Sequence, residues 1–417
     1  MIINVSSVAT TDSAILYPIT ANGHYSSALK AIASQVSMPE DVLIRDFKAE
    51  HGEQRCLYGA NGQQLFLLGL GERASFQDVL KAARSFAHKQ KSKLGARLCV
   101  SFLAKNTLSD MASACEAVAN GLLLGTYQIG RFKSESTEAH PFDEKEATLT
   151  FALDEADTAG ILLAAERGQA MAATQQSIMD LINAPSNKKQ PVMLAEWALA
   201  SGKQYGYDVK VLDKPAIEAL GLHALLAVNQ GSNRPPAFIV MEYRPTESTG
   251  TLSKVGLVGK GITFDTGGLS IKPSTNMHYM KSDMGGAAAV FGAMEMAAKQ
   301  QLPIHLIGIV PTTENSVGSA AIKPGDVIDS YSGKTIEIID TDAEGRLILS
   351  DGIAYMQRHF QPDILIDLAT LTGSAVRTFG YHAGALFSND ETLQNQLMQA
   401  GQRVGERVWP LPLWDDY

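Results

Sequence analysis

Residues 253–268, with the sequence SKVGLVGKGITFDTGG, decide the fold class that we expect for this chain. The first half is an almost continuous apolar run, which is typical of a strand covered by helices on both faces of its sheet. The second half places a lysine, an aspartate and a pair of glycines directly after that strand. Because functional residues in such sheets collect where strands end, we expect a site near Lys260 and Asp265.

Similar apolar runs occur on both sides of this stretch. A helical pattern, GGAAAVFGAMEMAAKQQ at 285–301, lies between two of them. Strands that alternate with helices predict an α/β fold with a central mixed sheet covered by helices. The other expected strands are YDVKVL at 207–212, AFIVMEY at 237–243, IHLIGIV at 304–310 and DILIDLATL at 363–371.

The first 155 residues predict a separate α/β domain, because short apolar runs alternate there with helical patterns. The stretch from 157 to about 183 is rich in Ala, Gln and Leu and predicts one long helix, which Pro185 and Pro191 end. No catalytic cluster precedes this helix. We therefore expect an N-terminal α/β domain at 1–155, a linker helix at 156–190 and a catalytic domain at 191–417.

Composition favours an ordinary globular protein with room for two domains. The chain has 417 residues, of which 45% are hydrophobic and 19% charged, and its net charge of -9 does not favour binding to nucleic acid or anionic membranes. Three cysteines without paired spacing indicate neither disulfides nor a zinc–thiolate site, which fits the cytoplasm. We find no signal peptide and no apolar run near 18 residues, so we expect no export or membrane segment.

A row of acids follows the apolar residues of IIDTDAEGRL, at 338–347. Asp340, Asp342 and Glu344 occupy every second position. On an extended strand, side chains alternate between faces, so these carboxylates would share one side, roughly 6–7 Å apart. The apolar flanks indicate a largely buried environment, where like charges need a positive partner.

A second cluster of charged residues lies at 258–290. Gly267 and Gly268 permit backbone conformations that other residues resist, and a glycine pair opens a helix just after Asp283. Taken alone, Asp283 could be a simple helix N-cap and Lys260 a solvated lysine. Taken together, the two clusters predict a concentration of negative charge that two divalent cations would neutralise. Its four carboxylates are those of Asp265, Asp283, Asp342 and Glu344.

Other chemistries find little support in the sequence. It contains no serine-hydrolase elbow and no phosphate-binding loop, and GKGITFDTGG does not match the dinucleotide-binding pattern. Oxygen ligands suit Mg²⁺ or Mn²⁺, and Zn²⁺ also accepts carboxylates. A two-metal site is therefore the favoured hypothesis.

At these residues the chain closely resembles the leucyl aminopeptidase (cytosol aminopeptidase) family of dinuclear metallopeptidases. VGKGITFDTGG, SIKP, MKSDMGGAAAV, TDAEGRLILSDG and DLATLTG occur in the family's order between about 180 and 390. The resemblance implies two divalent metal ions per subunit, Zn²⁺ or Mn²⁺, with Mg²⁺ or Co²⁺ as further options. Asp265 and Glu344 would bridge the two ions. The full set of implied ligands is Lys260, Asp265, Asp283, Asp342 and Glu344.

The resemblance also implies an aminopeptidase that removes leucine-like residues from the N-terminus of peptides. A hydroxide held between the metals would attack the scissile carbonyl, while the free α-amine of the peptide binds one metal. Lys272 would stabilise the oxyanion, and Arg346 would hold a bicarbonate that acts as general base. The pocket for the first side chain would include Met280, Thr370 and Gly373.

The sequence departs from the family in two places. The family usually has Asn where this chain has Asp340, and an acid there could raise metal affinity or, when protonated, act like an amide. Family chains continue well past the match to LPLWD at 411–415, so we expect a catalytic domain without the family's final segment. Family members are homohexamers, and we expect the same assembly here.

Two alternatives remain open from the sequence. A two-metal phosphoesterase could use similar carboxylates, but the implied lysine ligand and the lack of histidine-bearing ligand motifs disfavour it. The other is a DNA-binding or scaffolding oligomer with secondary peptidase activity, which the acidic net charge does not favour.

Overall fold

The computed structural model describes residues 1–9, 12–22, 25–103, 110–135, 138–153, 157–246, 250 and 252–416. They form two compact units, one of residues 1–173 with 373–417 and the other of residues 174–372. The domain limits that we predicted from the sequence stay a prediction.

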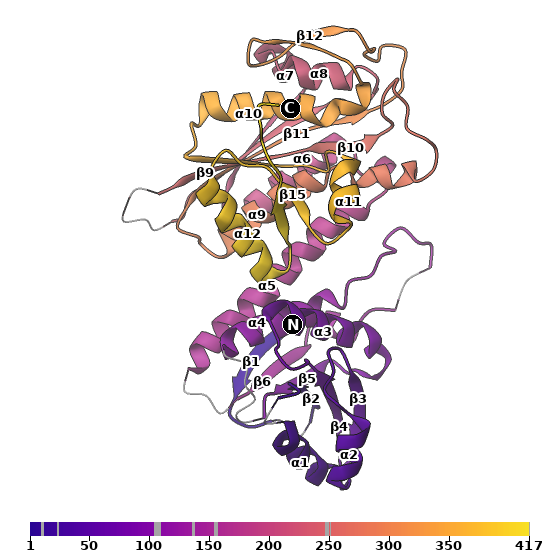
Figure 1. The fold of residues 1–417 in the computed structure, drawn as a ribbon, viewed down its shortest axis with the longest axis vertical. Helices are drawn as coiled ribbons and strands as arrows, with labels where there is room; N and C mark the ends of the chain where they lie inside the picture. The colour runs from indigo at the N-terminus through magenta and orange to yellow at the C-terminus, as the bar shows by residue number, and fades with distance from the viewer. Residues whose placement is uncertain are drawn as a thin grey trace. The chain divides into compact units, whose positions relative to one another are not determined.

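A six-stranded sheet forms the centre of the unit that contains the N-terminus (Figure 1). Its order is β1-β6-β5-β2-β4-β3, and every pair of neighbours is parallel except the antiparallel pair of β3 and β4. The bounds of its strands are β1 (Ile2–Ser6), β2 (Ala14–Ile19), β3 (Gln54–Tyr58), β4 (Gln64–Gly69), β5 (Arg97–Ser101) and β6 (Thr148–Ala152).

Helices cover this sheet on both faces because successive strand side chains point to opposite sides. Leu16 and Phe66 belong to the apolar cluster shared with the helices α3 and α4, whereas Ile15 and Leu65 belong to the cluster shared with α1 and α2. The bounds of these helices are α1 (Tyr25–Gln35), α2 (Glu40–Asp46), α3 (Phe76–Lys89) and α4 (Met111–Leu124), and two short 3₁₀ turns are η1 (Lys91–Lys93) and η2 (Pro141–Asp143).

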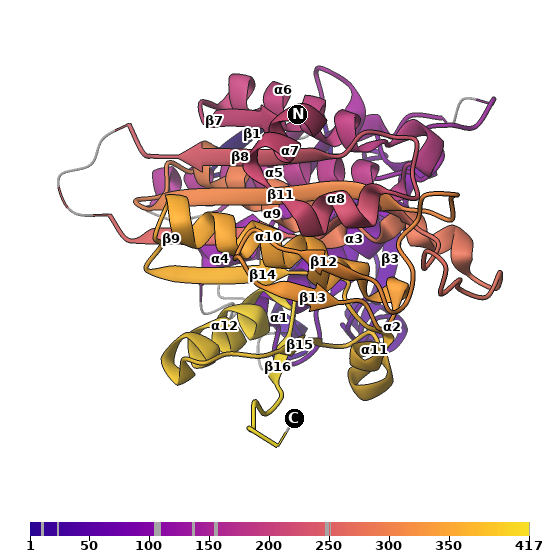
Figure 2. The ribbon, with the colours of Figure 1, turned by 90° about the horizontal axis from the view of Figure 1, so that it is seen from above.

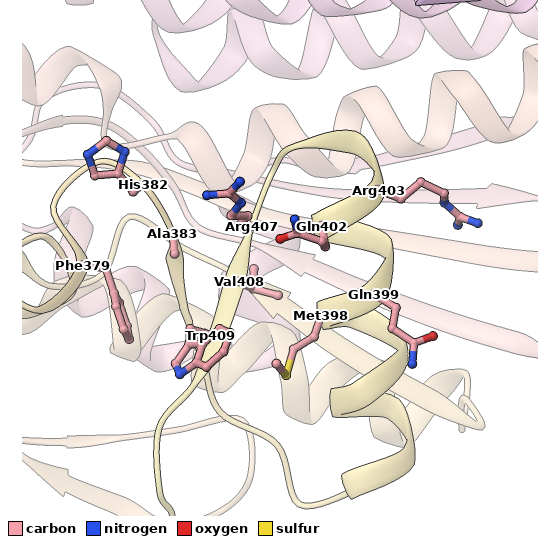
Figure 3. Close-up of a pocket in the computed structure, with 10 residues that line it drawn as sticks. All are labelled: Phe379, His382, Ala383, Met398, Gln399, Gln402, Arg403, Arg407, Val408 and Trp409. Atoms are coloured by element: carbon pink, nitrogen blue, oxygen red, sulfur yellow. The ribbon is translucent and has the colours of Figure 1, made fainter. Parts of the chain in front are cut away.

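The segment 373–417 belongs to the same unit and lines an open pocket of about 830 Å³ (Figure 3). Apolar side chains such as Phe379, Met398 and Trp409 line it, and Arg403 and Arg407 also contribute to the lining. Its lining contains His382 but no carboxylate. The elements of this segment are α11 (Gly373–Phe379), β15 (Gly384–Leu386), α12 (Glu391–Val404) and β16 (Val408–Pro410).

The unit of residues 174–372 contains a mixed sheet in the order β14-β9-β11-β8-β7, and β10 also pairs with β11 (Figure 2). β9 is parallel to β14 and to β11, and β10 is parallel to β11. β8 is antiparallel to both β11 and β7. The predicted mixed sheet is confirmed. Its strands are β7 (Asp208–Leu212), β8 (Ala237–Tyr243), β9 (Lys254–Gly259), β10 (Gly261–Asp265), β11 (His305–Asn315) and β14 (Ile364–Leu368).

Alternate side chains of these strands feed two apolar clusters, one on each face of the sheet. Phe238 and Ile307 pack with the helices α8 and α10, and Ile239 and Leu306 pack with α6 and α9 (Figure 1). The covered sheet that the apolar runs predicted is therefore present. The helices are α6 (Pro191–Tyr205), α7 (Lys214–Leu220), α8 (His223–Asn229), α9 (Gly285–Lys299) and α10 (Glu344–His359).

Short elements complete this unit. The 3₁₀ turns are η3 (Ser186–Lys188), η4 (Met277–Ser282) and η5 (Thr341–Ala343), and the strands β12 (Val327–Asp329) and β13 (Thr335–Glu337) form an antiparallel pair.

One long helix, α5 (Thr158–Asn183), contributes residues to both units and confirms the helix predicted from 157 to about 183. Within the described part of the chain, none of the helices combines the length and the apolar character needed to cross a bilayer.

The start of α9 approaches the end of β14 so closely that it requires a glycine. A Cβ atom on Gly286 would lie 1.9 Å from the Leu368 carbonyl oxygen, whereas one on Gly285 would lie 3.2 Å from a methyl group of Thr370.

We therefore expect Gly286→Ala to lower the free energy of unfolding by about 1–3 kcal/mol, because the backbone must shift. Gly285→Ala is the matched control, since alanine also favours a helix. Urea unfolding of both variants measures the difference, and equal stabilities would contradict this packing.

Candidate functional site

Four carboxylates gather where strands end and helices begin in the unit of residues 174–372. Asp265 ends β10, Asp283 follows η4, Asp342 lies in η5, and Glu344 opens α10. One carboxylate oxygen from each of Asp265, Asp342 and Glu344 lies within 4.8 Å of the other two. The structure thus brings together residues that are far apart in the sequence.

The extended strand that we expected through residues 340–344 is wrong. Strand β13 ends at Glu337, residues 341–343 form a 3₁₀ turn, and Glu344 begins a helix. The cause lies in Asp340, whose Oδ1 accepts a hydrogen bond from the Asp342 N–H at 2.9 Å, in the manner of a helix N-cap. Asp342 and Glu344 therefore meet through a helical turn and not through the alternation of a strand.

This hydrogen bond also bears on the departure from the family at Asp340. The side chain is exposed, and the oxygen that accepts the bond has a counterpart in the amide of an asparagine. Either residue could therefore cap the turn. An effect of Asp340 on metal preference or pH optimum stays a prediction.

Lys260 connects Asp283 to this cluster from its position between β9 and β10. Its buried Nζ lies 2.8 Å from both Asp283 Oδ2 and Glu344 Oε1, and it donates to the Thr370 carbonyl oxygen at 3.1 Å. Burial by itself lowers the pKa of Lys260, but the two carboxylates together raise this pKa above its ordinary value. With these carboxylates around it Lys260 is charged, so it would have to lose a proton to ligate a metal.

Lys272 lies on the other side of Asp265. Its partly exposed Nζ is 2.8 Å from Asp265 Oδ2 and 2.5 Å from Asp342 Oδ1. Burial lowers the pKa of Lys272, but these two carboxylates outweigh that effect and raise it. The intervening chain turns at Gly267 and Gly268, which have φ angles of +85° and +64° that favour glycine.

The carboxylates themselves are difficult to keep charged. Burial raises the pKa of Asp283 to about 6 and that of Glu344 to about 7, and the neighbouring Asp265 adds to both shifts. Burial also raises the pKa of Asp342. Lys260 opposes the shifts of Asp283 and Glu344 but does not cancel them, so the cluster has room for further positive charge.

Three oxygen atoms of the cluster test whether it fits a metal. Asp283 Oδ2, Asp342 Oδ1 and Glu344 Oε1 are buried and accept no hydrogen bond from the described residues. A lysine Nζ lies within 2.8 Å of each, at ion-pair distance. Buried carboxylate oxygens whose charge only an ammonium group balances are suited to ligate divalent cations such as Mn²⁺, Mg²⁺ or Zn²⁺, so the residues fit such ions.

Sequence reasoning missed Asn315, the buried last residue of β11. Its Nδ2 donates to Asp265 Oδ1 at 2.8 Å and to the Thr341 carbonyl oxygen at 3.0 Å, and it approaches Glu344 Oε2 at 3.5 Å. One amide thus orients two of the carboxylates. Its place at the end of an apolar strand, the same signal that identified Asp265, could have revealed it.

The remaining predicted site residues occupy varied positions. Thr370 donates its hydroxyl hydrogen to Asp283 Oδ1 at 2.7 Å and so contacts the cluster. Met280 is half-buried in η4, and Arg346 is exposed on α10, two residues after Glu344. Gly373 opens α11 in the other compact unit. The roles of Met280, Thr370 and Gly373 in a pocket stay predictions.

Comparison with known proteins covers both parts of the chain. The catalytic domain of the cytosol aminopeptidase family matches residues 176–417, and the N-terminal domain of the same family matches residues 19–136. A probable cytosol aminopeptidase of Chlorobium limicola is 41% identical over 99% of this chain and 85% of its own length. One of a Geobacter species is 42% identical over 89% of this chain and 75% of its own length.

Solved structures of similar proteins share the fold. The bottromycin maturation enzyme BotP in complex with Mn has a TM-score of 0.83 at 31% identity, over 97% of this chain and 82% of its own. A mutant of tomato leucine aminopeptidase has a TM-score of 0.87 at 27% identity, over all of this chain and 83% of its own. With these likenesses beside the carboxylate cluster, the chain belongs to the cytosol aminopeptidase family and is a metal-dependent aminopeptidase, a peptide hydrolase.

Proposed function

We propose that the cluster holds two divalent metal ions, Zn²⁺ or Mn²⁺, with Mg²⁺ and Co²⁺ as further options. The observation that carries this proposal is the set of three buried carboxylate oxygens that accept no hydrogen bond. The complex of the similar enzyme BotP with Mn supports manganese as one candidate. The five ligands would be Lys260, Asp265, Asp283, Asp342 and Glu344.

Asp265 and Glu344 are best placed to serve both ions. Asp265 contacts Lys272, Glu344 contacts Lys260, and the amide of Asn315 lies against both carboxylates. The two carboxylates therefore lie between the two positive groups of the site. Asn315 lies against one oxygen of each, and the other oxygen, which faces a lysine, is the one that would turn toward a cation.

The side chains at the edge of the cluster would assist peptide hydrolysis. Two bound cations would supply a water of lowered pKa and would polarise the scissile carbonyl. Lys272, partly exposed and charged, would donate a hydrogen bond to the oxyanion that develops on that carbonyl. Arg346, exposed near Glu344 on the same helix, would position a bicarbonate ion, the general base that the family resemblance implies, beside the substrate.

We propose peptides with leucine-like first residues as substrates. Thr370 contacts Asp283 directly, and Met280 precedes Asp283 by three residues, so both lie near this proposed ligand. An apolar, adaptable methionine suits an aliphatic side chain. Gly373 completes the proposed pocket on the strength of the resemblance alone.

Assembly and location follow from family likeness. We propose a homohexamer, as in the family, and a cytoplasmic location, which the name of the relatives, cytosol aminopeptidase, supports. The comparisons give no support to the alternative of a DNA-binding or scaffolding oligomer.

Removal and return of metal tests the proposed function. Protein stripped with a chelator should lose hydrolysis of leucine p-nitroanilide, and Zn²⁺, Mn²⁺, Co²⁺ or Mg²⁺ added separately should restore it to different extents. Full activity should require two ions per subunit, measured by elemental analysis. p-Nitrophenyl phosphate should not be hydrolysed, which separates a peptidase from a phosphoesterase. Hydrolysis that persists after verified stripping would overturn the two-metal mechanism.

Lys272 should act on the rate and not on substrate affinity. We expect Lys272→Met to lower kcat by about 100- to 1000-fold, because a preorganised donor to the oxyanion is lost, while KM changes little. Lys323→Met is the control, since Lys323 is an exposed lysine paired with Asp326. Both variants should keep two ions per subunit. A Lys272→Met enzyme with normal kcat would refute this role.

The stability of the metal-stripped protein should depend on the charge of Glu344. The folded-state pKa of about 7 lies above the ordinary value of 4.5, so the folded protein binds more protons than the unfolded chain between these values. The free energy of unfolding should therefore fall as pH rises from 4.5 to about 7. Glu344→Gln should flatten this fall, and Glu337→Gln, at an exposed position, should not. Urea unfolding in the presence of a chelator measures how the free energy of unfolding changes with pH in both variants. Equal changes would show that burial of Glu344 does not cause the fall in stability.

A further inference from the structure

A buried lysine lies outside the proposed ligand set. Lys189 follows η3, and only 1% of it is exposed. No carboxylate of the described residues lies within ion-pair distance of it, in contrast to Lys260, Lys272 and Lys299. A buried amine without a carboxylate is costly, and an apolar side chain of similar size would pack there at lower cost. The presence of a lysine at this position must therefore be explained by its contacts.

The partners of Lys189 are two backbone carbonyl groups. Its Nζ donates to the Lys281 carbonyl oxygen at 2.5 Å and to the Ile182 carbonyl oxygen at 3.2 Å. Ile182 lies in the last turn of α5, where carbonyl groups lack partners within the helix and carry partial negative charge. Lys189 thus links the end of α5 to the 3₁₀ turn η4.

A second lysine makes the reciprocal connection. The Nζ of Lys281 donates to the carbonyl oxygen of Asn183, the residue that ends α5, at 2.7 Å. Three hydrogen bonds from these two lysines therefore connect the end of α5 with η4. Each ends on a backbone carbonyl, so the join fixes main chain and not only side chains.

The anchored segment carries proposed site residues. η4 includes Met280, and the N–H of Asp283 donates to the Met280 carbonyl oxygen at 3.3 Å. Met277–Ser282 contacts β10 but has no buried residue of its own, so little apolar packing holds it in place. Its position depends on contacts such as those of the two lysines.

We infer that Lys189 is a positioning residue that, with Lys281, holds η4 against the end of α5 and so places Asp283 for metal binding. The inference rests on the proposed function in that Asp283 is taken as a metal ligand. Lys189 itself would contact neither the metal nor the substrate.

The test compares Lys189→Met with Lys254→Met in the full chain. Lys254 donates to the Phe360 carbonyl oxygen at 2.8 Å, at the opposite end of β9 from Lys260, so the control loses the same kind of bond away from the cluster. Hydrogen exchange of the stripped protein should become at least tenfold faster at 277–284 in Lys189→Met alone. The thermal midpoint should stay the same or rise, because an apolar side chain replaces the buried amine.

Calorimetric titration with Mn²⁺ then measures the consequence for binding. Lys189→Met should weaken one of two binding events by about 10- to 100-fold, as expected for groups that orient ligands, and Lys254→Met should change neither. Unchanged exchange at 277–284 would overturn the inference. Faster exchange with unchanged Mn²⁺ binding would overturn its second half, the placement of Asp283.

The outcomes separate this inference from the proposed function. If the unsubstituted protein binds no divalent ion, the proposed function fails, while the exchange data still decide whether Lys189 positions η4. If Lys189→Met does not fold, Lys281→Met removes the reciprocal bond and should give the same local exchange and the same loss of Mn²⁺ affinity.

Discussion

The site depends on one electrostatic constraint: four carboxylates share a small, largely buried volume. Burial and mutual repulsion raise the pKa values of Asp283, Asp342 and Glu344, so the cluster is stable only with positive charge beside it. Lys260 and Lys272 supply part of that charge through four close contacts. The pKa values of Asp283, Asp342 and Glu344 stay raised beside these lysines, so the two lysines do not balance the carboxylates fully.

The fold meets this constraint by using strand ends and helix starts. β10 and β11 are parallel and end together at Asp265 and Asn315, and Lys260 directly follows β9, which precedes β10 along β11. Helices α9 and α10 begin near these strand ends, beside Asp283 and at Glu344. The close approach of Gly286 to Leu368 lets α9 begin directly against β14.

Sequence patterns predicted the helices and strands well, but they predicted only some of the side-chain contacts at the site. Apolar runs predicted β8, β9 and β14 because strands covered on both faces need apolar residues throughout. The carboxylates were recognised because their spacing and their family motifs are distinctive, yet the expected strand through Asp340 gave way to a capped turn, since a local hydrogen bond outweighed strand alternation. Asn315 and Lys189 were missed because neither an isolated amide nor an isolated lysine has a pattern; only the fold reveals their partners.

The lysines that balance the carboxylates also compete with metal. Lys260 lies 2.8 Å from the oxygen atoms of Asp283 and Glu344 that accept no hydrogen bond, so a cation that takes these oxygen atoms must displace the ammonium group or deprotonate it. As the ligand that we propose, Lys260 would release a proton and keep its position, and the positive charge of the lysine would be exchanged for the larger charge of the metal. Metal binding at this site would then be an exchange of cations within a preformed anionic cluster. The carboxylates that destabilise one another in the free chain would become the source of affinity, and Lys260 would set the proton cost of that exchange.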